Sequence, residues 1–191
     1  MILPIVQYGH PALRQKGERI EKITPEIRAL IADMFDTMYA AAGVGLAAQQ
    51  VGRALQLTVL DVRGVKDRPS TMELKGAPVD PVENMPLVLL NPVLKPFGDP
   101  VSGSEGCLSF PEIYEEIIRP PSVEVTALSE KGEPIQFIAG GLLGRAIQHE
   151  VDHLNGILFI DRMPLTAKRA LKPELEALQQ RTKEALPDRS L

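Results

Sequence analysis

The sequence predicts an α+β fold, in which mixed or antiparallel β-sheets pack around a central helix and a further helix lies toward each end of the chain. Strand-like runs come in pairs around tight turns, and few segments show helical periodicity. Strands and helices are therefore segregated and do not alternate as they do around a parallel sheet. The 191 residues show no internal repeat and no domain boundary, so we expect a single domain over residues 1–191.

The N-terminal helix is predicted to begin at Thr24, which is a favourable N-cap, followed by Pro25 in the first turn. Gly43 is the expected stop. Between them, apolar residues recur at helical spacing at Ile27, Leu30, Ile31, Met34 and Met38.

The predicted strands lie between residues 55 and 138. Residues 55–62 form an apolar run typical of a buried strand, and strand character resumes at residues 87–92. Residues 124–138 show two strands around a Lys-Gly turn. The intervening residues 63–86 are rich in proline and charge and lack periodicity, so we interpret them as a long surface loop or insertion.

The central helix is predicted over residues 142–154, with Asn155 and Gly156 at its C-terminal end. A short strand is expected at residues 157–160, and residues 165–191 are expected to form a polar, exposed helix and a tail. The apolar face of the central helix is formed by Leu142, Leu143, Ala146, Ile147, Val151 and Leu154.

The composition limits the classes of protein to which this chain can belong. Hydrophobic residues make up 44% of the chain, enough for a core, and the formal net charge of −4 gives no general attraction to nucleic acid or anionic membranes. No apolar run approaches a membrane span, and the N-terminus lacks the features of a secretory signal. The single cysteine, Cys107, excludes an intrachain disulfide, so a cytoplasmic protein is expected.

The segment QHEVDH, residues 148–153, carries the residues of a metal site. His149 and His153 are four residues apart, so a helix presents both imidazoles on one face to one metal ion. Glu150 is rotated by about 100° from His149, where its carboxylate can act as general base for a metal-bound water. Two histidines leave a catalytic site one protein ligand short of the usual three.

Three candidates compete for the third ligand. A histidine three residues after Gly156 would complete a common metalloprotease pattern, but that position is Phe159. Glu174 or Glu176 lies at the distance at which gluzincin-like metallopeptidases take a glutamate from a following helix. Cys107 is the third candidate, because a thiolate is a good ligand for zinc or ferrous iron.

Three separated motifs show a resemblance to a known family. They are GVGLAAQQ (43–50), EGCLS (105–109) and QHEVDH (148–153), and in this order they resemble the peptide deformylases. The resemblance extends from ILPIVQYGHPALR near the N-terminus to GILFIDRM at residues 156–163. It implies an enzyme that hydrolyses the N-formyl group of the N-terminal methionine of new polypeptides and releases formate.

The resemblance also implies the metal site. Its ligands would be Cys107, His149 and His153, with water in the fourth position. Ferrous iron (Fe2+), one ion per chain, is the ion that the resemblance favours, and the ligand set also suits Zn2+, Ni2+ or Co2+. Glu105 and Arg119 match family positions that form a supporting ion pair.

The catalytic roles follow from the same resemblance. The metal would lower the pKa of its water so that hydroxide attacks the formyl carbonyl, and Glu150 would take the proton and pass it to the leaving amine. The oxyanion would be stabilised by the side-chain amide of Gln50 and the backbone N–H of Leu108. The motif assigns this glutamine to Gln50 and not to Gln49.

The substrate is expected to bind as an added strand beside the first motif, with its methionine side chain in an apolar pocket. The alkyl stem of Arg145 is expected to form one wall of that pocket, with its head group in water. The expected substrate-binding residues are Gly43, Val44, Gly45, Leu142, Arg145 and Ala146. Tyr114 stands where many bacterial members carry arginine, which changes the contacts expected on that side, and Asp152 has no assigned role.

The partners implied are N-formyl-methionyl nascent peptides and the ribosome, the latter through the C-terminal helix. That helix mixes basic and acidic residues, so a solvated face is the alternative interpretation. Two other functions stay open: a gluzincin-like metallopeptidase that uses Glu174 or Glu176, and a catalytically silent deformylase-like protein that binds formyl-methionyl chain ends or the ribosome. The basic residues concerned are Lys168, Arg169, Lys172, Arg181 and Lys183.

Overall fold

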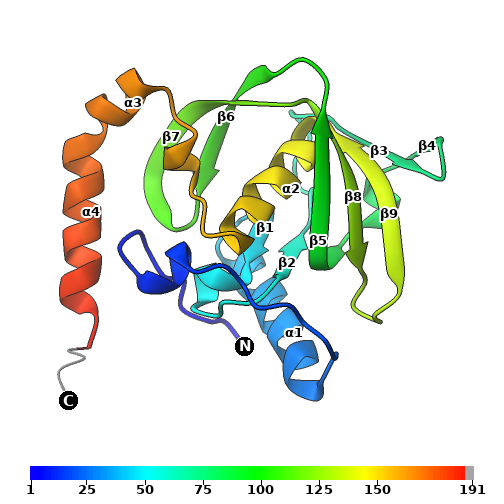
Figure 1. Cartoon of the computed structure of the whole chain (residues 1–191), viewed down its shortest axis with the longest axis horizontal. Coiled ribbons are helices and arrows are strands. Elements are labelled where there is room, and N and C mark those ends of the chain that lie inside the picture. Colours follow the sequence, from blue (N-terminus) through cyan, green and yellow to red (C-terminus); the bar gives the residue numbers. More distant parts are fainter. Residues whose placement is uncertain (188–191) are drawn as a thin grey trace.

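The computed structural model describes residues 1–187 and places helix α2 at the centre, beside a curved sheet and a separate hairpin (Figure 1). The helices are α1 (Pro25–Ala40), α2 (Gly141–Leu154), α3 (Leu165–Ala170) and α4 (Lys172–Ala185). The strands are β1 (Gly45–Ala47), β2 (Leu57–Leu60), β3 (Ser70–Leu74), β4 (Ala77–Val79), β5 (Leu87–Phe97), β6 (Val101–Cys107), β7 (Phe110–Arg119), β8 (Ser122–Leu128) and β9 (Pro134–Gly140). The predicted α+β class is confirmed.

Helix α1 has the predicted start but a different end. The hydroxyl of Thr24 accepts a hydrogen bond from the N–H of Ile27 at 3.3 Å, as an N-cap should. At the C-terminal end, Ala42 takes the left-handed conformation with φ of 53°, and the N–H of Gly43 donates to the carbonyl of Met38 at 2.9 Å. Gly43 is therefore already part of the segment that leads into β1.

The large sheet has the strand order β1-β2-β5-β8-β9-β3-β4, and neighbouring strands are antiparallel. Strand β1 is an edge strand, so one side of its backbone is not used within the sheet. In β5 the register shifts between Leu90 and Val93, and Asn91 within this bulge has a φ of 51°. The Asn91 amide bonds both the N–H and the carbonyl of Ile20 at 2.9 Å, which fastens the N-terminal segment to the sheet.

Residues 63–86, which we interpreted as a long surface loop or insertion, contain two strands in their middle part. Strands β3 and β4 form a hairpin there, and β3 pairs with β9 through Thr71, Met72 and Glu73. The prolines and charges hid this strand, because β4 contains Pro78 and the hairpin buries few side chains. Met72, only 4% exposed, is the residue that enters the core.

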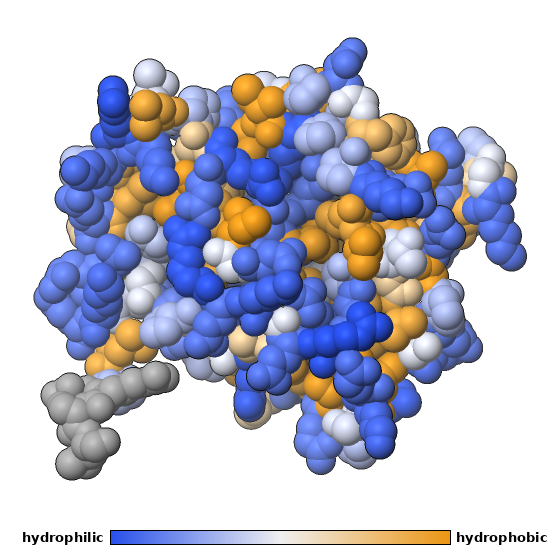
Figure 2. All heavy atoms as spheres, in the orientation of Figure 1, coloured by the Kyte–Doolittle hydropathy of each residue, from blue (hydrophilic) through white to orange (hydrophobic). Residues whose placement is uncertain are grey.

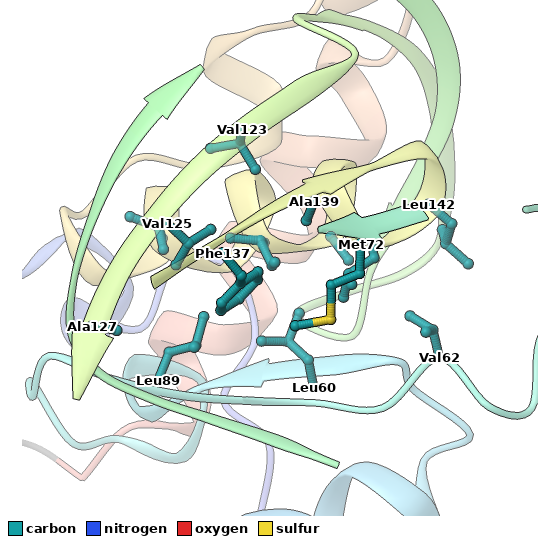
Figure 3. Packing of buried hydrophobic residues seen from close by; sticks show 14 of the residues in the cluster. Leu60, Val62, Met72, Leu89, Val123, Val125, Ala127, Phe137, Ala139 and Leu142 are labelled. Atoms are coloured by element: carbon teal, nitrogen blue, oxygen red, sulfur yellow. The ribbon is translucent and has the colours of Figure 1, made fainter. Parts of the chain in front are cut away.

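Helix α2 is buried over its whole length and packs against β1, β2, β3, β8 and β9. Figure 3 shows the side chains of the sheet converging on the space beneath it, with Phe137 opposite Leu60 and Met72. The helix ends as predicted, with Asn155 as C-cap and Gly156 at a φ of 71°. A helix so enclosed can hold polar side chains only where partners or a ligand compensate for their burial.

Strands β6 and β7 form a two-stranded sheet of their own. Their register shifts between Gly106 and Cys107, where β6 ends and the chain turns into β7. The EGCLS motif therefore lies at the tip of this hairpin, at an irregularity that frees it from regular pairing.

The C-terminal region differs from the sequence-based expectation in two places. Residues 157–160 do not form a strand, since Phe159–Asp161 is a short 3-10 helix with Phe159 and Ile160 buried. The expected single helix is divided into α3 and α4, and Leu175 and Leu178 of α4 pack against the core. The outer surface of this region is mostly hydrophilic (Figure 2). Residues 188–191 of the predicted tail lie outside the described part.

Among residues 1–187, no helix has the length and apolar character needed to cross a membrane.

A polar cluster connects α1 with the end of β2. The hydroxyl of Tyr39 donates to Asp61 at 2.6 Å, and Arg63 donates to both oxygens of the same carboxylate. Hydrogen bonds from Arg63, against the opposing effect of burial and with further help from Tyr39, lower the pKa of Asp61 to about 2. The N–H of Asp61 also donates to the carbonyl of Val44 at 2.9 Å, so the cluster supports the segment before β1.

This cluster predicts a pH-dependent contribution to stability. Because the folded pKa of Asp61 is depressed, its contribution is complete above the unfolded pKa of about 4 and is lost as pH falls toward about 2. We expect Asp61→Asn to lower the free energy of unfolding by about 1–2 kcal/mol at neutral pH, with the difference shrinking over that window. Urea unfolding with a chelator present measures it, and Asp99→Asn, at an exposed aspartate, is the control for loss of a carboxylate. A difference that stays constant from pH 6 to pH 2 would contradict the assignment.

Candidate metal centre

Cys107, His149 and His153 meet in one place. Their donor atoms all lie within 4.8 Å of one another, and the Cys107 sulfur is 3.3 Å from Nε2 of His153. The two histidines come from successive turns of α2 and are buried, whereas the cysteine comes from the tip of the β6–β7 hairpin. One thiolate and two imidazoles make a donor set that suits a transition-metal ion.

The surroundings of the two histidines determine their protonation. Burial, together with the neighbouring His149, holds the pKa of His153 well below its ordinary value, which leaves the neutral imidazole that a metal ligand requires. Burial opposes a charge on His149 as well, but interactions with Cys107 and Glu105 outweigh it and raise the pKa of His149. Metal binding at this site is therefore coupled to proton release.

Glu105 fixes the orientation of His149. Nδ1 of His149 donates to Oε1 of Glu105 at 2.9 Å, so Nε2 is the nitrogen that points toward the cysteine and His153. Burial alone would raise the pKa of Glu105, but hydrogen bonds from His149 and Arg119 outweigh it and hold the pKa well below the usual range. The carboxylate is thus charged and can only accept hydrogen bonds.

Arg119 lies against Glu105 in the ion pair that the sequence suggested. Its Nε and one terminal nitrogen donate to the two oxygens of Glu105 at 2.6 and 2.9 Å, and the guanidinium is 3% exposed. The other terminal nitrogen donates to Asp152 at 2.8 Å, and Asp152 also accepts from Arg162. Asp152, which had no role assigned from its motif, therefore links the arginine of the hairpin to the segment after α2.

The expectation that the head group of Arg145 lies in water is wrong. Its side chain is only 10% exposed, and its head group donates to Glu105 at 2.9 Å and to the carbonyls of Ile117 and Val101 at 2.7 and 3.0 Å. A guanidinium paired with a buried carboxylate is held in the interior and not in water, because leaving that carboxylate with fewer partners would cost more. The head group of Arg145 is therefore engaged with Glu105 and the hairpin backbone.

A cavity of about 390 Å³ opens beside Cys107 and His149, whereas His153 is not among its lining residues. The predicted catalytic residues Gln50, Leu108 and Glu150 line it, as do Cys107 and His149. All of the predicted substrate-binding residues line it too, namely Gly43, Val44, Gly45, Leu142, Arg145 and Ala146. Strand β1 supplies one wall with the free edge of the large sheet, and the β6–β7 hairpin supplies the opposite wall.

Gln50 and Gln49 occupy different environments although they are adjacent. Oε1 of Gln50 accepts from the N–H of Ala47 at 2.9 Å, which turns its NH₂ group toward Cys107 at 3.6 Å and Ser109 at 3.4 Å. Nε2 of Gln49 instead donates to the carbonyl of Leu154 at 3.3 Å, away from the cavity. Gln50 therefore presents donor groups to the site, and Gln49 joins α2 to the segment after β1.

Glu150 is enclosed beside the ligands. Burial raises the pKa of Glu150 to about 7, only partly offset by the nearby His149. Its Oε2 atom is buried and has no hydrogen-bond partner among residues 1–187, as expected for a group that meets a ligand or water. A Cβ at Gly45 would lie 2.5 Å from Oε1 of Glu150, so glycine is needed where β1 passes the carboxylate.

The alternative that uses a downstream glutamate is wrong. Glu174 is on α4 and lines a separate cavity with Gln7 and Ile113, and Glu176 forms an exposed ion pair with Lys172. The ligand cluster found within residues 1–187 contains the cysteine and neither of these glutamates.

Besides Tyr114, which was already named from the sequence, the site includes residues for which no role was predicted. Ser109 and Ser104 border the glutamine and the cavity, and Arg68 reaches the cavity from the segment before β3. Tyr114 lies at the rim and is 70% exposed, and its ring covers Gly106, where a Cβ would meet it. Ser109 could have been assigned to the site from its position in EGCLS. Arg68 lies in a segment without periodicity or motif, so nothing in the sequence places it at the site.

Comparisons with known proteins agree with this site. A sequence profile of the polypeptide deformylase family matches residues 2–169. A peptide deformylase of Methylacidiphilum infernorum is 45% identical over 179 residues, covering 94% of each chain, and one of Opitutus terrae is 44% identical with 97% of each chain covered. The crystal structure of a peptide deformylase from Synechococcus elongatus in complex with actinonin superposes with a TM-score of 0.76 at 40% identity, covering 90% of this chain and 87% of that one.

These similarities extend over nearly the whole chain and include the segments that carry the cysteine, the two histidines and Glu150. They leave no support for the binding-only alternative. The chain belongs to the peptide deformylase family, and its activity is the removal of the N-formyl group from nascent peptides.

Proposed function

We propose that deformylation here uses Glu150 as the proton carrier, Gln50 and the Leu108 N–H as oxyanion donors, and Fe2+ as the ion held by Cys107, His149 and His153. The observation that carries the proposal is that Glu150, Gln50, Leu108, Cys107 and His149 line one cavity, with the donor atom of His153 within 4.8 Å of those of the other two ligands. When bound, a divalent ion supplies a Lewis acid that lowers the pKa of a water ligand. The remaining steps are carried by side chains and backbone of this chain.

Glu150 has the position and the environment of a general base. A carboxyl group with a pKa near neutrality accepts a proton from an attacking water and returns it to the leaving amine at the same pH. Its Oε2 has no hydrogen-bond partner among residues 1–187, and the absence of a side chain at Gly45 leaves room for Oε1 of the same carboxylate.

Gln50 and the backbone N–H of Leu108 are the proposed oxyanion donors next to the cysteine. The N–H of Ala47 holds the Gln50 amide so that its NH₂ group donates into the cavity. Leu108 follows Cys107 at the end of β6, and its side chain packs where a Cβ on Gly43 would come within 2.8 Å. This close packing joins the GVGLAAQQ segment to the hairpin tip, and it fixes the two donors relative to each other.

The formylated peptide is proposed to lie along the free edge of β1. An extended chain can bond the backbone of Gly43, Val44 and Gly45 there, which is strand addition. Leu142, Ala146 and the stem of Arg145 then offer an apolar wall from α2 to the methionine side chain. Tyr114 takes part from the opposite rim, where it offers a ring and a hydroxyl in place of a guanidinium.

The ribosome as a partner and the cytoplasm as the compartment stay predictions. The basic residues of α3 and α4 lie on the outside of a region that is anchored through Leu175 and Leu178, which leaves them free for an anionic surface.

Replacement of Cys107 tests whether the metal is held by three ligands or by the two histidines alone. We expect Cys107→Ala to abolish stable metal binding, because two imidazoles alone do not complete the set. In the native chain, metal at about 100 times its Kd should raise the free energy of unfolding by about 2.7 kcal/mol, and Cys107→Ala should lose this gain. Elemental analysis after anaerobic purification, with thermal unfolding plus and minus chelator, gives both readings. Glu176→Ala is the matched control and should keep the metal.

Replacement of the proton carrier should leave the metal in place. Glu150→Gln is nearly isosteric and is not among the ligands, so we expect native metal content with formate release from a formyl-Met peptide reduced roughly 10²- to 10⁴-fold. Glu176→Gln, on the exposed face of α4, controls for loss of a carboxylate. Full activity of Glu150→Gln would show that another group moves the proton.

The two adjacent glutamines offer a test of the oxyanion assignment. We expect Gln50→Ala to lower kcat by about 10²- to 10³-fold with little change in KM, because its amide would act mainly in the transition state. Gln49→Ala should mainly lower the melting temperature, since its amide bonds the carbonyl of Leu154. Steady-state kinetics and thermal unfolding of both variants decide, and the assignment fails if the two glutamines show the reverse pattern.

A further inference from the structure

We propose that Arg145 is a positioning residue of the metal centre, which acts through Glu105 on His149 and holds the β6–β7 hairpin against α2. The proposal rests on the metal site and the deformylase activity described above. It gives Arg145 a task distinct from substrate contact.

The two halves of the ligand set come from different elements. The histidines belong to α2, and Cys107 belongs to the tip of β6. Because no single element carries all three ligands, their separation depends on how the hairpin sits against the helix. A contact between helix and hairpin near the site therefore sets the metal geometry.

Arg145 makes such a contact from one turn before His149. Its guanidinium donates to the carbonyl of Val101 on β6 at 3.0 Å and to that of Ile117 on β7 at 2.7 Å, with a longer bond to Gly103 at 3.4 Å. It thus joins α2 to both strands of the hairpin. A planar group with several donors can satisfy these acceptors together, which a lysine ammonium cannot do with the same geometry.

Arg145 also completes the bonding of Glu105. Oε1 of Glu105 accepts from His149 and Arg119, and Oε2 accepts from Arg119 at 2.6 Å and from Arg145 at 2.9 Å. The carboxylate is 5% exposed, so water cannot replace a lost donor. Without Arg145, Oε2 of the buried carboxylate keeps only Arg119 as a donor, so we expect the carboxylate to shift toward Arg119 and the orientation of His149 to change with it.

Gly103 provides an independent sign that the guanidinium belongs in this place. A Cβ on Gly103 would lie 2.8 Å from Cζ, Nε and a terminal nitrogen of Arg145. The head group therefore lies directly against the backbone of β6, and a side chain there would displace it. The pair predicts that a methyl group at position 103 has the same consequence as loss of the arginine head.

The same contacts argue against a direct role in substrate binding. The guanidinium is occupied by one carboxylate and by hairpin carbonyls, which leaves the alkyl stem of Arg145 as the part proposed above to contact a substrate in the cavity. Methionine at this position preserves much of that apolar stem. The KM of a formyl-Met peptide should therefore change little when the head group is removed.

The test measures metal affinity apart from catalysis. Cobalt(II) is titrated into the metal-free full chain, and its thiolate absorption reports binding at Cys107. We expect Arg145→Met to raise the Kd for cobalt by about 10- to 100-fold, with Arg145→Lys in between. With saturating cobalt, kcat for formate release should fall while KM stays within about twofold of native, because the head group acts on the ligands and not on the substrate. Arg63→Met, which removes an arginine from the Asp61 cluster, is the matched control and should bind cobalt as the native chain does.

Gly103→Ala keeps the proposal testable if Arg145→Met does not fold. In the native background it should weaken cobalt binding to a similar extent, and in an Arg145→Met background that folds it should add little. A cobalt Kd of Arg145→Met within twofold of native would overturn the proposal. A raised KM of Arg145→Met with unchanged cobalt affinity would also overturn it. So would a loss of cobalt affinity from Gly103→Ala that is equal in the native and the Arg145→Met backgrounds. If Arg145→Met does not fold, native cobalt affinity in Gly103→Ala alone would overturn it. If the native chain released no formate, the mechanism proposed above would fail, and the cobalt titrations would still decide the role of Arg145.

Discussion

The buried carboxylate of Glu105 connects helix α2 to the β6–β7 hairpin at the metal centre. It accepts from His149 on α2, from Arg119 at the end of β7 and from Arg145 one turn before the histidine. Burying a carboxylate and two guanidinium groups is costly unless each is paired. The network therefore holds the hairpin and the helix in one relative position, and any rearrangement would leave a charge without a partner. The ligand distances follow from that arrangement and not from α2 alone.

The network also explains why so polar a helix can be buried. Helix α2 carries Arg145, Gln148, His149, Glu150, Asp152 and His153 within its buried stretch. One face packs on the sheet, as the apolar periodicity predicts, and the polar residues bind the hairpin, the following segment or the metal cavity. Two atoms of this helix are exceptions, because Oε2 of Glu150 and Nδ1 of His153 have no hydrogen-bond partner among residues 1–187. Both residues belong to the metal centre, where burial costs stability and serves the chemistry of the site.

The sequence predicted the local features well and the long-range ones only by resemblance. Helix α1 from its Thr24 cap, helix α2 and the hairpin of β8 and β9 all follow from periodicity and turn residues. Cys107 could be joined to His149 only through the family motifs, because nothing local shows that β6 ends against α2. The position of the Arg145 head group was missed because an arginine on a helix normally extends to water. Its acceptors, Val101 and Ile117, are backbone carbonyls, which leave no trace in side-chain patterns.

The features that the sequence did not predict and the metal site have one physical cause in common. Strand β3, the short 3-10 helix at Phe159–Asp161 and the guanidinium of Arg145 are all set by tertiary contacts that override local preference. The hairpin tip is the strongest case, since its register shift at Gly106 and Cys107 interrupts regular pairing just where the cysteine must turn toward two histidines. Gly43, Gly45 and Gly103 let other segments approach to distances that a Cβ would forbid. The site therefore depends on close contacts between separate elements. The glycines that permit these contacts matter more for it than the secondary-structure preference of each segment.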